Sequence, residues 1–200
     1  MLKIYLLRHG QTPWNADGNR YCGRTDLPLT EKGIAQATSV REQLKNISFD
    51  AVYSSPLQRA FATAQIAGGE QNVIKDERLI EADFGQWEGK TRIEFIEENG
   101  KLWYDWALDP AKTKAGGTGE TAREVVDRVD EFFNYLLQHY EDAEILVVGH
   151  NAVNRFYLAH KLGMSLKNYR RIMQDNSTIT MFHLEKDGEL TLVHLNSLLS

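Results

Sequence analysis

The sequence predicts an α/β protein, a three-layer α/β/α sandwich with a mostly parallel central sheet and an antiparallel edge strand. Short apolar runs alternate with longer segments of helical periodicity, which is the order of a parallel sheet with helices on both faces. Residues 2–7 and 145–148 are almost continuously apolar, as is typical of strands covered on both faces. The last two runs flank Asp187-Gly188, a turn sequence typical of a hairpin.

In the first part of the chain, turn and capping residues separate the strands from the helices. Thr30 is a suitable N-cap, Pro56 lies just before a helix, and Gly68-Gly69 ends that helix. The predicted strands lie at 2–7, 49–53 and 73–75, and the predicted helices at about 30–45 and 57–67.

The segment at about 82–120 interrupts this alternation. It is rich in aromatic residues and then in lysine and glycine, so we expect a helical insertion or lid followed by a mobile loop at 112–119. Thr121 and Glu124 then form a capping box that begins a long amphipathic helix ending near His139. The remaining predicted elements are a strand at 145–148, a helix at about 152–162 and hairpin strands at 178–184 and 189–195.

Composition restricts the class of protein. With 200 residues, 42% of them hydrophobic, we expect a single domain over 1–200 that includes the insertion. A net charge of -5 argues against a nucleic-acid partner, so any phosphate site must be a local positive pocket. The chain lacks both a signal-peptide pattern and an apolar run of about 18 residues, and Cys22 has no second cysteine to pair with. We expect a cytoplasmic enzyme without a membrane partner.

Charged side chains follow several predicted strands. Arg8 and His9 come directly after the first strand, Arg59 lies soon after the second, and His150 follows the strand at 145–148. Because ligands of open α/β sheets bind outside the carboxyl ends of the strands, we expect these residues to share one site. Each residue alone fits an ordinary surface turn or a solvated helix, and only their joint occurrence favours a site.

The chemistry of these residues suits phosphoryl transfer. Arg8 and Arg59 offer planar charged forks for phosphate oxygens, and His150 adds a further donor. His9 is the candidate nucleophile, since the neighbouring Gly10 is small enough for a ligand to approach the backbone. Glu81 is the candidate acid and base for the leaving oxygen and for water, provided that its pKa is raised.

Five segments carry a resemblance to a known family: LLRHGQTPWN, LPLTEKGIAQA, YSSPLQRAFATA, ERLIEADFGQWEGK and VVGHNAV. In this order they resemble the histidine phosphatase superfamily, the phosphoglycerate mutase-like family. The resemblance implies transient phosphorylation of His9, phosphate binding by the residues named above, and proton transfer by Glu81. It further implies that Asn15 and the Cys22-Gly23 turn contact phosphate or substrate, and that neither a metal nor an organic cofactor is needed.

Two departures from the family pattern concern the substrate pocket. Gln11 stands where the family often has glutamate, and Asn151 stands where it often has glycine, so both are candidate substrate-binding residues. For Asn154, Arg155 and Asn176, a place in the pocket and a structural role are both open. The aromatic residues Trp103, Tyr104 and Trp106 fit either a cover over the substrate or the packing core of the insertion.

We expect a phosphomonoesterase that hydrolyses a small phosphorylated metabolite through phosphorylated His9, because the insertion is short for a mutase. The alternatives are a 2,3-bisphosphoglycerate-dependent phosphoglycerate mutase and, from another class, a noncatalytic regulatory or interaction domain on the same fold. Among relatives of this size the substrates include sugar phosphates, phosphoglycerates, phosphoserine and α-ribazole phosphate, and the sequence does not choose between them. A homodimer paired through the sheet edge or the insertion is compatible with the sequence.

Overall fold

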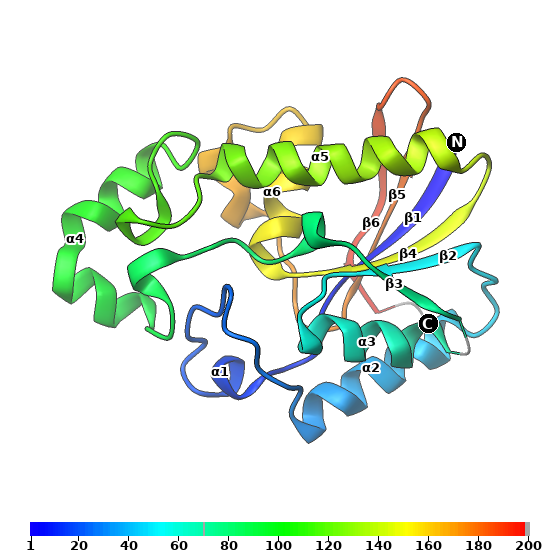
Figure 1. Ribbon diagram of the computed structural model, residues 1–200, viewed down its shortest axis with the longest axis horizontal. Coiled ribbons are helices and arrows are strands. Elements are labelled where there is room, and N and C mark those ends of the chain that lie inside the picture. Colours follow the sequence, from blue (N-terminus) through cyan, green and yellow to red (C-terminus); the bar gives the residue numbers. More distant parts are fainter. Residues whose placement is uncertain (70, 199–200) are drawn as a thin grey trace.

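Six strands form one mixed sheet in the computed structural model, which describes residues 1–69 and 71–198 (Figure 1). Their order is β3-β2-β4-β1-β5-β6. The first four strands are parallel, while β5 runs antiparallel to β1 and to β6. This confirms the predicted mostly parallel sheet with an antiparallel edge. The strands are β1 (Leu2–Arg8), β2 (Ala51–Ser54), β3 (Val73–Lys75), β4 (Glu144–Gly149), β5 (Ile179–Leu184) and β6 (Leu190–Ser197).

Helices cover both faces of the sheet, with α2 (Glu31–Leu44) and α3 (Gln58–Gly68) on one side and α5 (Ala122–His139) and α6 (Asn151–Lys161) on the other (Figure 1). The alternation of side chains along β1 divides its apolar residues between two cores. Ile4 and Leu6 join the cluster under α5 and α6, while Leu7 joins the cluster under α2 and α3. This two-sided burial is why the run at 2–7 is continuously apolar.

The predicted helix starts are confirmed by their caps. The Thr30 hydroxyl accepts a hydrogen bond from the Gly33 amide at 3.1 Å, and Thr121 and Glu124 form the expected capping box. Strand bounds differ slightly at β2, which starts at Ala51 rather than at Phe49. The Phe49 ring instead packs edge-on against the ring of Tyr5.

The segment at 82–120, where an insertion was expected, is partly helical. Helix α4 (Arg92–Leu108) follows the short 3-10 helix η2 (Gly85–Trp87) and precedes η3 (Ala115–Gly117). The rings of Trp87 and Phe95 stack at a centroid distance of 4.7 Å, and together with Trp106 they belong to the core cluster of α5 and α6. The insertion is therefore packed onto the main core and does not stand apart from it.

The loop at 112–119, expected to be mobile, is held by backbone hydrogen bonds. The Ala115 amide donates to the Glu120 carbonyl at 3.1 Å, and the Glu120 amide donates to the Asp83 carbonyl at 2.9 Å. Ala115 and Gly119 are buried. The lysine- and glycine-rich composition suggested mobility because composition shows neither these local bonds nor the bond by which Glu120, the next residue, is tied to Asp83.

Some short helices outside the segment at 82–120 were not predicted, since three to six residues carry too little periodicity to detect. Helix α1 (Pro13–Ala16) follows a capping box formed by Thr12 and Asn15. The other two are the 3-10 helices η1 (Glu77–Leu79) and η4 (Leu166–Arg171).

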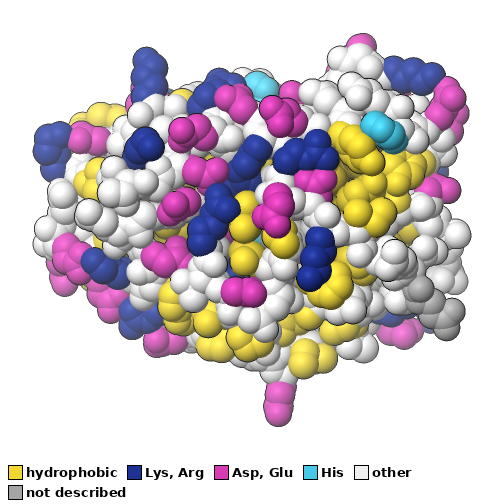
Figure 2. All heavy atoms as spheres, in the orientation of Figure 1, with side chains coloured by type: hydrophobic (Ala, Val, Ile, Leu, Met, Phe, Trp, Pro, Cys, Tyr) yellow, Lys and Arg dark blue, Asp and Glu magenta, His cyan; other side chains and the backbone are white. Residues whose placement is uncertain are grey.

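On the face shown in Figure 2, basic and acidic side chains are interspersed. The net charge of -5 is therefore not gathered into one area of that face. Among the described residues, no helix has the length and apolar character needed to cross a membrane.

A close backbone contact joins the loop after β1 to the start of α2. A Cβ atom placed on Gly10 would lie 2.4 Å from the Gly33 carbonyl oxygen, and one on Gly33 would lie 2.2 Å from the carbonyl oxygen of Gln11. Both distances are too short for a side chain. Gly10 therefore allows the close approach of α2, a role that was not expected from the sequence.

We predict that Gly33→Ala lowers the free energy of unfolding by about 1–3 kcal/mol, although alanine favours helices, because the added methyl group overpacks this contact. Gly100→Ala is the matched control, since its Cβ would approach other atoms only to 3.9 Å. We expect the control to change the free energy by less than about 1 kcal/mol. Urea denaturation measures both, and equal effects of the two substitutions would show that the contact is not tight.

Candidate active site

The sheet brings the predicted catalytic residues together at the carboxyl ends of its strands. Arg8 ends β1 opposite Gly149, the last residue of β4. The His9 amide donates to the Gly149 carbonyl at 3.2 Å, and the rings of His9 and His150 lie 5.1 Å apart between centroids. Arg59 enters from the first turn of α3, which follows β2. This clustering follows from the parallel topology.

His9 is buried and held in one tautomer. Its Nδ1 lies 2.7 Å from the Gly10 carbonyl oxygen, which can only accept, so Nδ1 carries the proton and Nε2 keeps a free lone pair. Burial and the nearby cations Arg59 and Arg8 hold the pKa of His9 well below its ordinary value. At neutral pH the side chain is therefore a neutral imidazole with Nε2 ready to attack.

His150 lies beside His9 as the N-cap residue of α6. Its Nε2 is 2.7 Å from the Ser55 hydroxyl oxygen, and its Nδ1 is buried without a hydrogen-bond partner among the described residues. Burial and Arg59 lower the pKa of His150 as well. If the Ser55 hydroxyl donates its proton to Nε2, the single ring proton of neutral His150 lies on Nδ1. Nδ1 can then donate a hydrogen bond to an anion.

Arg59 is fully buried and is held by carbonyl oxygens, not by a carboxylate. Its guanidinium donates to Thr25 and Gly23 at 2.8 Å each and to Cys22 at 3.2 Å. Its charge is therefore not neutralised by an ion pair within the described residues. The same bonds fold the loop at 22–25 over the start of α3.

Arg8 is also buried, and its Nη1 donates to the Gln174 carbonyl at 2.8 Å. Burial lowers the pKa of Arg8 to about 10, which still leaves it charged at neutral pH. Three of the four buried side-chain nitrogens that lack a partner in the described chain belong to this group of residues: Nε of Arg8, Nε of Arg59 and Nδ1 of His150. A buried unpaired donor is costly, so this group of donors suits an anion.

Glu81 accepts three backbone hydrogen bonds, from Ala82 at 2.9 Å, Val153 at 3.1 Å and Ala152 at 3.2 Å. Two of these amides belong to the first turn of α6, whose N-terminus favours negative charge. Burial nevertheless raises the pKa of Glu81, while the three amides and Arg59 oppose that rise. The balance suits a carboxyl group that gains and loses a proton.

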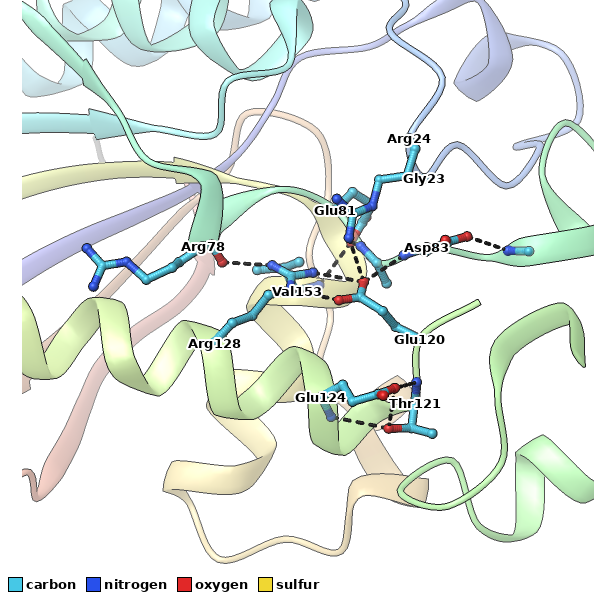
Figure 3. A network of polar contacts seen from close by, with 12 residues as sticks. Gly23, Arg24, Arg78, Glu81, Asp83, Glu120, Thr121, Glu124, Arg128 and Val153 are labelled. Atoms are coloured by element: carbon cyan, nitrogen blue, oxygen red, sulfur yellow. Dashed lines mark hydrogen bonds and ion pairs between the residues drawn. The ribbon is translucent and has the colours of Figure 1, made fainter. Parts of the chain in front are cut away.

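A polar network fixes the loop that follows Glu81 (Figure 3). The carboxylate of Glu120 accepts from Arg24 and Arg128 and from the Asp83 amide. Arg128 in turn donates to the Arg78 carbonyl at 2.7 Å, just before Glu81 in the chain. The network therefore anchors this loop to α5 on both sides of Glu81.

A cavity of about 150 Å³ opens beside these residues. Four arginines and a single carboxylate, Glu81, are among its lining residues, so the cavity is positive within an acidic protein. Among the described residues, no cluster of three histidine, cysteine or acidic side chains could hold a metal ion. The lining comprises Arg8, His9, Asn15, Asn19, Arg20, Tyr21, Cys22, Glu81, Phe84, Asn151, Ala152, Arg155, Tyr169 and Arg170.

The candidate substrate-binding residues divide between this lining and its surroundings. Asn15, Cys22 and Asn151 line the cavity, and burial raises the pKa of the Cys22 thiol to about 11, so it stays protonated. Gln11 lies outside the lining, with its side-chain oxygen accepting from Thr30 at 3.1 Å.

Gly10 and Gly23 lie outside the lining as well. The Gly23 carbonyl accepts a hydrogen bond from Arg59. A Cβ atom on Gly23 would lie 2.4 Å from the Ala82 carbonyl oxygen. It thus allows two loops of the site to meet.

Of the three residues whose roles the sequence left open, one lines the cavity and two do not. Arg155 lines the cavity. Asn154 is buried behind it and donates to the Leu7 carbonyl at 3.0 Å, which is a structural role. Asn176 donates to the His9 carbonyl at 2.9 Å and so supports the nucleophile loop from outside the lining.

Of the insertion aromatics, Phe84 lines the cavity. Trp103 packs against Trp87, Trp106 is buried and Tyr104 is 62% exposed, so these three are not among the lining residues.

Several lining residues were not predicted, because they do not follow a strand. Tyr21 lies in the loop after α1, and Tyr169 and Arg170 lie in η4. The run NYRR at 168–171, with two arginines beside a tyrosine, was the one signal that could have indicated them.

Comparisons with known proteins find similarity to phosphatases. The chain is 32% identical over 194 residues to phosphoserine phosphatase 1 of Hydrogenobacter thermophilus, covering 96% of this chain and 91% of that protein. It is 33% identical over 167 residues to adenosylcobalamin/alpha-ribazole phosphatase of Escherichia coli, covering 82% and 80%. The crystal structure of phosphoserine phosphatase from Entamoeba histolytica in complex with 3-phosphoglyceric acid superposes with a TM-score of 0.87 at 35% identity, covering 98% of each chain.

The family pattern of the histidine phosphatase superfamily (branch 1) matches residues 4–197. Because that match spans nearly the whole chain and includes the strand ends that form the site, the chain belongs to branch 1 of the histidine phosphatase superfamily.

Proposed function

We propose that the chain hydrolyses a small phosphomonoester through a phosphohistidine formed on His9. One observation carries this proposal: neutral His9 lies beside three buried donors that lack partners, on Arg8, Arg59 and His150. A phosphoryl group spreads its charge over three oxygens during transfer, and these donors match that charge.

In the first step, Nε2 of His9 attacks phosphorus, the P–N bond forms and the ester P–O bond breaks. Glu81 gives its proton to the leaving oxygen, so the product leaves as an alcohol. In the second step, a water oxygen attacks phosphorus and the P–N bond breaks. Glu81 takes the proton of that water, so inorganic phosphate leaves and the starting protonation state of the enzyme is restored.

A cavity of about 150 Å³ that contains His9 and Arg8 is compatible with a small phosphorylated substrate. The relatives point to phosphoserine and α-ribazole phosphate as substrates, and the Entamoeba histolytica structure binds 3-phosphoglyceric acid. We assign Asn15, Cys22 and Asn151 to substrate contact, since they line the same cavity as His9.

The phosphohistidine can be trapped. After mixing with labelled phosphomonoester and quenching in alkali, in which phosphohistidine is stable, we expect label on the wild-type protein and none on His9→Ala. His139→Ala is the matched control, because His139 is exposed on α5. Label that survives in His9→Ala would place the nucleophile elsewhere.

The proton role of Glu81 depends on the leaving group. We expect Glu81→Gln to lower kcat/KM for an alkyl phosphate by about 10²–10⁴-fold, the usual worth of general acid catalysis. For p-nitrophenyl phosphate the loss is much smaller, since nitrophenolate leaves without a proton. The parameter kcat/KM includes only the steps up to phosphorylation of His9. Equal losses on both substrates would remove the acid role from Glu81.

The pH dependence of kcat/KM provides a separate test. Because Glu81 must be protonated to donate and burial raises its pKa, we expect activity on an alkyl phosphate to fall as the pH rises through that pKa. In Glu81→Gln this alkaline fall disappears, while any limb caused by ionisation of the substrate itself stays. Protonation of His9 lowers activity only well below pH 6.5. An unchanged alkaline limb in the variant would contradict the assignment.

A further inference from the structure

Two arginines of the cavity, Arg155 and Arg170, are not required by the phosphate site. Both line the cavity, and neither forms an ion pair with an acidic side chain in the part of the chain that the structure describes. Arg20, by contrast, also lines the cavity but pairs with Asp17 and Glu94. Besides Arg8 of the phosphate site, the cavity therefore has two further cations whose charge is not balanced by an ion pair in the described part of the chain.

Arg170 is held rigidly by neutral groups. Its Nε donates to the Tyr169 hydroxyl at 2.9 Å and its Nη2 donates to the Tyr21 hydroxyl at 2.6 Å. Its guanidinium carbon lies 4.3 Å from the centroid of the Trp103 ring. These contacts fix the orientation of the guanidinium but leave its charge in place, and Nη1 has no hydrogen-bond partner within residues 1–69 and 71–198. A fixed fork with a free donor is suited to a planar anion.

Arg155 lies between this group and the phosphate site. It donates to the backbone carbonyls of Ile172 and Arg170 and, at 3.4 Å, to the side-chain oxygen of Asn151. It is within electrostatic reach of Arg8 on one side and of Arg170 on the other. Burial lowers the pKa of Arg155, so an anion nearby would stabilise its charged form. The positive charge thus continues from the phosphate donors along one wall of the cavity.

We propose that Arg170 and Arg155 bind a carboxylate group of the substrate a few atoms from its phosphoester. This inference rests on the proposed phosphatase function and narrows its substrate class to small phosphorylated carboxylic acids. A carboxylate matches the planar fork of Arg170. It also fits a cavity of about 150 Å³ that must hold the phosphoryl group at the same time, whereas the nucleoside part of α-ribazole phosphate brings no anion to this wall.

The test uses substrates that differ only in the carboxylate. 3-Phosphoglycerate and glycerol 3-phosphate share their skeleton and phosphoester, and phosphoserine and phosphoethanolamine form a second pair. We expect wild-type kcat/KM to be about 10- to 100-fold higher for the acid in each pair, as for a charged hydrogen bond made or lost. Equal values within both pairs would overturn the carboxylate site while leaving the phosphatase proposal intact.

Variants then assign the preference to the residues. We expect Arg170→Gln to lower the ratio of kcat/KM between 3-phosphoglycerate and glycerol 3-phosphate by about 10-fold or more. Arg170→Lys should lower this ratio less, since it keeps the charge and loses the fork. Arg123→Gln is the matched control, because Arg123 is exposed on α5 and is not among the cavity lining residues. A ratio unchanged in Arg170→Gln would contradict the role of this side chain.

Binding separates this inference from the proposed reaction. Calorimetry on His9→Ala measures affinity without turnover, and we expect 3-phosphoglycerate to bind at least about 10-fold more tightly than glycerol 3-phosphate. If the wild type hydrolyses no substrate but this difference is present, the proposed reaction fails and the carboxylate site stands. Equal affinities for the two compounds would overturn the carboxylate site whatever the turnover.

Discussion

The burial of two guanidinium groups without carboxylate partners is the constraint on which the rest of the site depends. A buried charge costs several kcal/mol unless other groups compensate. Here backbone carbonyls compensate in part: three of them hold Arg59 and one holds Arg8. The loop at 22–25 must therefore fold over α3, and the loop around Gln174 must lie beside β1. Burial lowers the pKa of both histidines, and the two guanidinium charges lower it further. Arg59 also opposes the rise that burial causes in the pKa of Glu81.

Much of the fold could be predicted from the sequence, because periodicity and caps are local signals. The two continuously apolar runs became the central strands β1 and β4, and Thr30 and Thr121 cap the helices that they were expected to cap. Features that depend on distant contacts were not predicted. The loop at 112–119 looked mobile because composition shows neither its hydrogen bond to Glu120 nor the bond from Glu120 to Asp83, and α1 is too short for periodicity to be detected.

The candidate site also contains residues that could be predicted and residues that could not. The parallel topology carries His9, His150, Arg8 and Arg59 to one place, so their order in the sequence was enough to group them. The part of the cavity lining formed by Tyr21, Tyr169 and Arg170 could not be predicted, since these residues come from two segments that do not follow strands. Gln11 was misleading for a related reason: its place after His9 suggested the pocket, but its side chain meets Thr30 at the start of α2.

The phosphate site and the surroundings of Arg170 are built on different elements, and this has an evolutionary consequence. Most of the groups expected to carry out phosphoryl transfer stand at strand ends or in the first turn of a helix, where a change would disturb the core, and Glu81 lies in the loop after η1, held by amides of α6. The groups that hold Arg170 are Tyr21 in the loop after α1, Trp103 in α4 and Tyr169 in η4, all outside the sheet. Substitutions there can alter which compound is accepted while the chemical step is inherited unchanged. We therefore expect proteins with this fold to change substrates through substitutions in these three segments outside the sheet.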